Sequence, residues 1–170
     1  ATGWVAGRVE IDPDEMPGDD VRWIAAWVGP APAIVATPGA GPFVRSALDV
    51  LKAEGRAQDG GGIRLMAAHE VTGTGAVLLT APALPAQLGA ANQALARRGI
   101  PWRFGAARPP GRLRGDGVEG VDVRSRYALL PTGGARVDTL ASVDGEPWAV
   151  AGITTAGPYV IAASPLVPEA

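Results

Sequence analysis

The sequence predicts an α/β protein: a short parallel sheet flanked by helices, followed by an antiparallel β meander and preceded by a β hairpin. Between residues 33 and 104, short apolar runs alternate with glycine-rich turns and amphipathic stretches, which is typical of parallel β–α–β units. Beyond residue 105 no helical pattern separates the strand-like runs, which comprise residues 121–130, 137–143, 147–151 and 159–163. The chain of 170 residues is long enough for one α/β domain and a fragment of a neighbouring domain.

Two runs at the start predict a hairpin. Residues 4–11 and 21–28 have strand-forming composition, and an acidic segment, residues 12–20, joins them. Its carboxylates lack the D-x-D-x-D-G spacing of a calcium loop, so we expect a solvated turn. Because an isolated hairpin is only marginally stable, this one either joins the following sheet or ends a β-sandwich whose other strands are missing. We therefore divide the chain into a hairpin, residues 1–29, and an α/β domain, residues 30–170.

The first half of a β–α–β unit comes next. Residues 33–37 (AIVAT) predict a strand that is buried on both faces, and residues 42–54 predict a helix that ends at Gly55. The side chains expected to face the core recur at helical spacing and are those of Phe43, Ala47, Leu48 and Leu51.

A complete helix-to-strand unit is the clearest pattern in the chain. Two more strands are predicted at residues 63–67 and 76–80, and the helix after them has Pro85 near its start and Gly99 as its C-terminal cap. Residues 102–104 are expected to extend the parallel sheet, with right-handed crossovers placing helices on both of its faces.

The remaining segments predict a loop and an antiparallel meander. Residues 103–114 (RFGAARPPGRLR) are expected to form a solvated loop, because Gly and Pro interrupt the run of arginines. Further on, Asp144 and Gly145 form a dipeptide that is a strong hairpin signal.

Composition excludes several classes of function. A net charge of −2 and a pI near 5.4 give no basic footprint for nucleic acid. The absence of cysteine removes disulfides, thiolate metal sites and cysteine nucleophiles, and one histidine with scattered carboxylates is too little for a zinc site, so we expect no metal and no cofactor. No run approaches the roughly 18 apolar residues of a membrane span, and no signal-peptide pattern is visible.

A turn between the first parallel strand and its helix contains the candidate ligand-binding residues Thr37, Gly39 and Gly41. Backbone N–H groups at a helix N-terminus can hold an anion, and ligands of parallel sheets bind at the carboxyl ends of the strands. The turn lacks the Gly-Lys-Ser/Thr ending of a P-loop and the third glycine of a dinucleotide fingerprint. The alternative is a turn that only reverses the chain.

Catalysis has weak support in the sequence. The single histidine, His69, follows a predicted strand and precedes Glu70, but no G-x-S-x-G elbow supplies a nucleophile. A surface or loop histidine is therefore favoured over a general base that acts with a carboxylate, and we expect no catalytic residues.

Aromatic and arginine side chains are the candidates for contact with a partner. Trp102, Trp148 and Tyr159 could stack on a base or sugar, but their strand positions favour packing. The residues expected to contact a protein partner are Trp4, Trp27, Arg103, Arg108 and Arg112.

Three stretches resemble a known family: GWVAGRVEIDPDEMPGDDVRW near the start, LGAANQALARRGIPWRFG in the middle, and DTLASVDGEPWAVAG followed by YVIAASPLVPE. In them the chain resembles the C-terminal part of bacterial membrane proteins that carry an N-terminal membrane domain of the aerotolerance-operon (Bat) type. The resemblance implies that residues 3–28 end a β-sandwich and that residues 33–166 are similar in fold to class I glutamine amidotransferases or flavodoxin-like proteins. Because those amidotransferases need a cysteine nucleophile, it implies a non-catalytic relative.

The leading hypothesis is a non-catalytic scaffold or protein-interaction domain of a bacterial membrane-associated protein, acting as an accessory subunit. The resemblance implies a periplasmic, extracytoplasmic position, with membrane-embedded protein subunits as partners and membrane contact only through segments outside this chain. The alternative is a small-molecule or anion-binding module that uses the turn at residues 37–42. Because the chain starts with Ala and stops just after an apolar strand, we expect it to be a piece of a longer polypeptide.

Overall fold

The computed structural model describes residues 3–10, 21–115, 118–133 and 138–165. Contacts divide the chain into two compact units, Ala1–Ala31 and Pro32–Ala170. The first unit is an antiparallel hairpin of β1 (Gly3–Glu10) and β2 (Val21–Val28). The acidic segment predicted to be a solvated turn lies outside the described residues.

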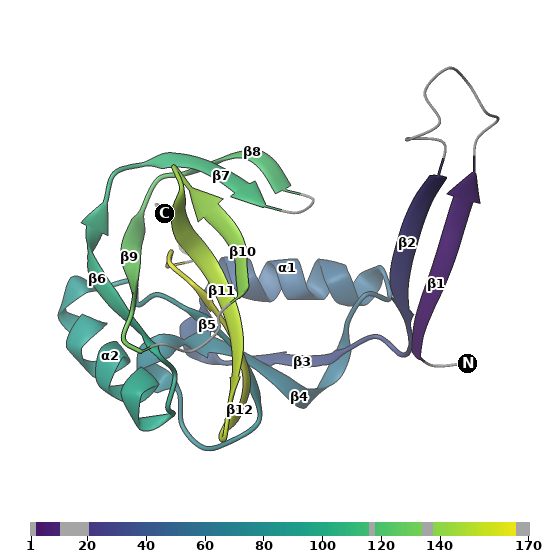
Figure 1. Ribbon diagram of the computed structural model, residues 1–170. Coiled ribbons are helices and arrows are strands. Elements are labelled where there is room, and N and C mark those ends of the chain that lie inside the picture. The colour runs from purple at the N-terminus through teal and green to yellow at the C-terminus, as the bar shows by residue number, and fades with distance from the viewer. Residues whose placement is uncertain (1–2, 11–20, 116–117, 134–137, 166–170) are drawn as a thin grey trace. The chain divides into compact units, whose positions relative to one another are not determined.

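A mixed sheet of eight described strands forms the frame of the second unit and curls into a half-barrel (Figure 1). Its first four strands run parallel to one another in the order β3–β4–β5–β12. They are β3 (Ala33–Ala36), β4 (Gln58–Ala67), β5 (Ala76–Thr80) and β12 (Gly157–Ala162). The sheet continues beyond β12 with antiparallel strands in the order β11–β10–β7–β8. They are β7 (Gly111–Gly115), β8 (Val118–Val123), β10 (Asp138–Val143) and β11 (Glu146–Thr154).

The described part of the second unit contains two α-helices, and the glycines predicted to end them are confirmed. The start of the second helix, predicted at Pro85, lies at Leu88 after a 3₁₀ turn. Helix α1 (Pro42–Ala53) connects β3 to β4, and α2 (Leu88–Arg97) follows β5. The glycines expected to end them, Gly55 and Gly99, have φ of 69° and 71°, a conformation that disfavours a Cβ. Single 3₁₀ turns lie at η1 (Pro38–Ala40), η2 (Ala68–Glu70) and η3 (Pro85–Gln87).

The predicted inward face of α1 is partly wrong. Phe43 is 55% exposed, whereas Val44 and Leu48 are buried. Both the stripe that begins at Phe43 and the stripe that begins at Val44 are apolar along the helix. Packing against the sheet therefore decided which of the two faces inward, and helical spacing alone did not.

The prediction of a short parallel sheet flanked by helices is wrong. The chain leaves the parallel sheet after α2, because β6 (Trp102–Arg108) pairs antiparallel with β9 (Arg126–Pro131) in a separate two-stranded sheet. Burial alternates along β6: Trp102 and Phe104 are buried and Arg103 is exposed. Such alternation marks a strand with one solvated face, whereas inner strands of helix-covered parallel sheets are buried on both faces. The fourth parallel strand is β12, which follows the antiparallel strands in sequence.

Two local predictions after residue 102 are also corrected, and one is confirmed. The expected solvated loop of residues 103–114 lies mostly in β6 and β7, and the expected strand of residues 121–130 is divided between β8 and β9. The predicted turn at Asp144 and Gly145 connects β10 to β11, and both residues have positive φ, 52° and 81°.

The main core lies between one face of the sheet and the layer formed by α2, β6 and β9. Its large fully buried side chains include Leu79 of β5, Leu95 of α2 and Ile161 of β12. Trp102 and Tyr159 belong to the same cluster, so the expectation that they pack is confirmed. Trp148 is partly buried against it, and its Nε1 donates a hydrogen bond to Ser164 Oγ at 2.8 Å.

Candidate functional site

The four parallel strands lead into one pocket, which we call the carboxyl-end pocket. Its volume is about 290 Å³. The segments that line it follow the last residues of β3, β4, β5 and β12. The residues that line it include Gly39, His69, Glu70, Thr80, Gln87 and Pro165. Ligands of parallel sheets bind at this edge, because loops from several strands converge there.

A carboxylate occupies the turn that was expected to hold a ligand. Thr37 Oγ1 donates a hydrogen bond to Glu70 Oε2 at 3.0 Å. A Cβ added at Gly39 would overlap the Glu70 carboxylate, so the glycine gives that carboxylate its space. The turn after β3 and the η2 segment after β4 are thereby joined, with an acidic group at their junction.

The imidazole of His69 lies in the same pocket wall. Gln87 Nε2 is 3.2 Å from His69 Nε2. Gln87 Nε2 donates to His69 Nε2 in the tautomer that carries its proton on Nδ1. That Nδ1 atom is buried and has no hydrogen-bond partner among the described residues. An unpaired buried donor is costly, so the ring gains stability from any group that supplies an acceptor.

The polar side chains at this pocket are largely paired with one another among the described residues. The chain contains no cysteine, and the hydroxyl of Thr37 already donates to Glu70. In the described part of the chain, Gln87 is the side chain that contacts the His69 ring, and no carboxylate is hydrogen-bonded to it. No group of three or more potential metal ligands was found in the same residues.

Two of the three predicted ligand-binding residues lie at the carboxyl-end pocket and one does not. Gly39 lines the carboxyl-end pocket and Thr37 holds its carboxylate. Gly41 is the N-cap of α1, with φ of 87°, and it does not line the pocket. The sequence did not predict that Glu70, His69 and Gln87 line one pocket, although two of these polar residues come shortly after a predicted strand.

The residues expected to contact a partner belong to several elements of the described structure. Arg103 is exposed on β6, while Arg108 Nη2 is 3.0 Å from Glu146 Oε1 and Arg112 Nε is 3.5 Å from Asp122 Oδ1. Trp4 and Trp27 are Cα partners in the register of the β1–β2 hairpin.

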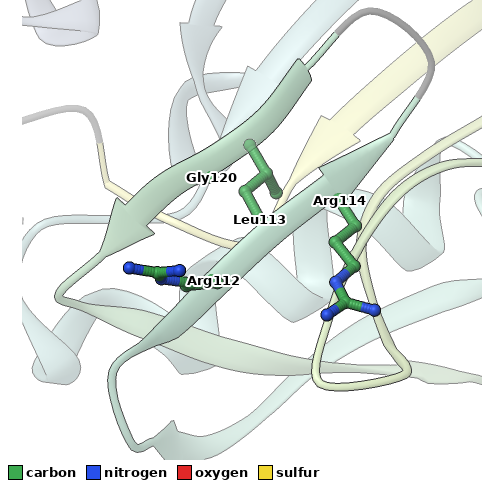
Figure 2. Close-up of a pocket in the computed structure, with 4 residues that line it drawn as sticks. All are labelled: Arg112, Leu113, Arg114 and Gly120. Carbon is green, nitrogen blue, oxygen red and sulfur yellow. The ribbon is translucent and has the colours of Figure 1, made fainter.

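A second hollow, of about 360 Å³, lies against β7 and β8. Figure 2 shows its lining: Arg112 and Arg114 on β7 with Leu113 between them, and Gly120 on the neighbouring strand. Arg112 is paired with Asp122, and both side chains are about three-quarters exposed, at 75% and 74%. Exposed ion pairs of this kind contribute little, so this hollow is a weaker candidate than the carboxyl-end pocket.

No protein-family model and no curated protein matches the chain. Among solved structures, it is similar to Cytoplasmic Protein STM1381 from Salmonella typhimurium LT2, with 13% identity and a TM-score of 0.55 over 97% of this chain and 86% of that one. It is also similar to the exo-beta-1,4-mannosidase Op5Man5 from Opitutaceae bacterium strain TAV5, with 16% identity and a TM-score of 0.51. That match covers 79% of this chain and 31% of the mannosidase. At such identities the likeness concerns the fold alone.

Proposed function

We propose that the second unit is a non-catalytic binding module whose carboxyl-end pocket takes a small polar molecule. The observation that carries the proposal is the convergence of Glu70, His69 and Gln87 on one pocket at the carboxyl ends of parallel strands. Most of the remaining lining is apolar or backbone, which is the usual composition of a small-molecule site with a few orienting polar groups.

The charge of the pocket points to a ligand with hydrogen-bond donors. An ionised carboxylate only accepts, and among the described lining residues there is no lysine or arginine to neutralise Glu70. A polyol or an amine satisfies Glu70, whereas a second anion is repelled by it. The proposed ligand is therefore neutral or cationic, in place of the anion that the glycine-rich turn suggested.

Amide-resolved NMR titration tests this proposal with defined probes: glycerol, mannitol, ethanolamine and inorganic phosphate. We expect saturable shifts at His69, Glu70 and Gln87 with a polyol or the amine, and none at these residues with phosphate. Glu70→Gln should weaken binding about tenfold, because hydrogen bonds to a charged group contribute more than neutral ones. Glu54→Gln is the matched control, because Glu54 is an exposed glutamate directly after the C-terminal end of α1. If no polyol or amine shifts these residues, or if Glu70→Gln binds as the natural protein does, the proposal fails.

The second candidate function is that of a protein-interaction domain of a bacterial membrane assembly, on its periplasmic side. The supporting observation is a set of exposed apolar side chains: Phe43 and Val50, two turns apart on α1, are 55% and 57% exposed, and Val35 of the edge strand β3 is 41% exposed. Exposed apolar side chains that gather on a surface are typical of protein-protein contacts. In the described residues, no helix combines the length and hydropathy needed to cross a membrane.

Site-specific crosslinking tests the second candidate. A photoreactive amino acid at position 43, in the protein expressed in bacterial cells, should crosslink one defined membrane subunit. Phe43→Glu should abolish reconstituted binding of that purified subunit, while Ile153→Glu, at an 83% exposed isoleucine of β11, should leave binding intact. Unchanged binding by Phe43→Glu would contradict this candidate.

A further inference from the structure

A further pocket lies at the amino ends of two of the parallel strands, β5 and β12, and we call it the amino-end pocket. Its volume is about 460 Å³. It is formed by the loop that precedes β5, the last turn of α2 and the turn that precedes β12. The polar side chains that line it are those of Thr72, Thr74, Arg97 and Arg98. None of them belongs to the carboxyl-end pocket.

Two arginines organise the loop of this pocket through its backbone. Arg98 is only 6% exposed, and its guanidinium donates to the carbonyl oxygens of Gly73, at 2.5 Å, and of Gly75. It also donates to the carbonyl oxygen of Ala156 at 3.3 Å. From β4, Arg64 Nη2 donates to the carbonyl oxygens of Thr72 and Thr74, each at 2.9 Å.

The positive charge gathered here is not neutralised by the described residues. The described ion pairs include neither Arg64 nor Arg97 nor Arg98, and every described acceptor of Arg64 and Arg98 is an uncharged carbonyl. Carbonyl dipoles and the C-terminal end of α2 offset part of this charge, because that end carries a partial negative charge of about one half. Burial lowers the pKa of Arg98, and the neighbouring Arg64 lowers it further.

Both arginines that line this pocket have donors without a described partner. The Nε of Arg98 is buried and has no hydrogen-bond partner among the described residues. Arg97, the last residue of α2, is exposed, has no described side-chain hydrogen bond and lines the pocket. A buried cation beside an exposed second cation and two threonine side chains is an arrangement that suits a compact oxyanion.

We propose that the amino-end pocket binds a small molecule through a phosphate group, either free or as a monoester. Arg97 and the hydroxyls of Thr72 and Thr74 contact the phosphate oxygens, and the charges of Arg64 and Arg98 favour a dianion over a monoanion. The pocket is larger than one phosphate, so an ester with a small organic group also fits. This site is independent of the polyol or amine site proposed above.

Melting and NMR experiments on the full chain test the proposal with inorganic phosphate and with phenyl phosphate, at constant ionic strength in chloride. We expect phosphate to raise the melting temperature and to shift the Nε–H signals of Arg97 and Arg98 with saturation. Arg97→Gln should raise the dissociation constant about tenfold while leaving the melting temperature in chloride unchanged, because its described contacts include no ion pair. Arg45→Gln, at an exposed arginine of α1, should bind like the natural protein.

The outcomes distinguish a phosphate ester from free phosphate, and both from arginines that only hold the loop. Tighter binding of phenyl phosphate assigns the site to an ester, and equal or tighter binding of inorganic phosphate assigns it to the free ion. Stabilisation by phosphate that Arg97→Gln retains in full, or an equal effect of acetate, would show that the arginines only clamp the loop, and the proposal would be overturned. Because different residues report on the carboxyl-end pocket, failure here leaves that proposal unaffected.

Discussion

The hydroxyl of Thr37 donates a hydrogen bond of 3.0 Å to the carboxylate of Glu70, which is 33 positions away in the chain. It connects the glycine-rich turn after β3 with the η2 segment after β4. The carboxylate fits there because residue 39 has no side chain. This contact gives the carboxyl-end pocket an acidic wall and determines which ligands it can accept.

Gly39→Ala should destabilise the protein because the new methyl group overlaps the Glu70 carboxylate. The overlapping atoms are the end of a flexible side chain, which can swing aside if it gives up its hydrogen bond to Thr37. We therefore expect a loss of about 0.5–1.5 kcal/mol in the free energy of unfolding, measured by urea denaturation. In a Glu70→Ala background the overlap is removed, so the same substitution should cost nothing or stabilise slightly. Gly89→Ala, with open space at its Cβ, is the control and should be neutral or stabilising. Equal costs of Gly39→Ala in both backgrounds would contradict the contact.

Glu146 should contribute a stability that depends on pH. Its pKa is lowered because Arg126 donates a hydrogen bond to its carboxylate; desolvation opposes this, and attraction to Arg108 and Arg126 lowers the pKa further. A carboxyl whose folded pKa lies below its unfolded pKa stabilises the native state above the unfolded value. That stability is lost as the pH falls through the folded value.

Glu146→Gln should therefore lower the free energy of unfolding more at pH 7 than at about pH 3. At the lower pH the natural protein also loses the stabilising charge, because Glu146 takes up a proton. Urea unfolding at both pH values measures the difference, and Glu54→Gln serves as the exposed control. A loss that is independent of pH would show that the hydrogen bond, and not the charge, is what Glu146 contributes.

Ile161 tests the place of β12 in the middle of the sheet, between β5 and β11. Its side chain is fully buried, so Ile161→Ala should cost about 2–5 kcal/mol through lost burial and a residual cavity. Ile153→Ala makes the same change at an 83% exposed position of β11 and should cost less than about 0.5 kcal/mol. Chemical denaturation of both variants gives the comparison, and similar losses would contradict the position of β12.

Arg98 should be needed for the loop before β5 to keep its structure. Arg98→Ala leaves the carbonyl groups of Gly73 and Gly75 without their donor, and we expect a loss of about 2–4 kcal/mol. Arg98→Lys should lie in between, because an ammonium group lacks the planar fork that reaches several carbonyls. Hydrogen exchange at residues 72–75 should accelerate in step with the loss. Exchange at these residues that stays slow in Arg98→Ala would show that the Arg98 hydrogen bonds do not hold the loop in place.

The sequence determined the features that depend on neighbouring residues. Pro42 and Gly55 mark the bounds of α1, Gly99 follows α2 with a left-handed backbone, and Asp144 with Gly145 makes a hairpin turn. These features follow from the backbone preferences of single residues and their nearest neighbours, so a pattern of a few residues is enough to predict them.

Tertiary structure alone decided which strands pair, which helix face is buried and which polar groups meet. The segment that begins at Trp102 can lie in either a parallel or an antiparallel sheet, and only its pairing with β9 settles the choice. The adjacent stripes of α1 that begin at Phe43 and Val44 are similarly apolar, and docking on the sheet selects one of them. The contact of Thr37 with Glu70 joins distant segments. Such choices depend on long-range packing energies, which differ between folds although the local preferences of the chain are the same.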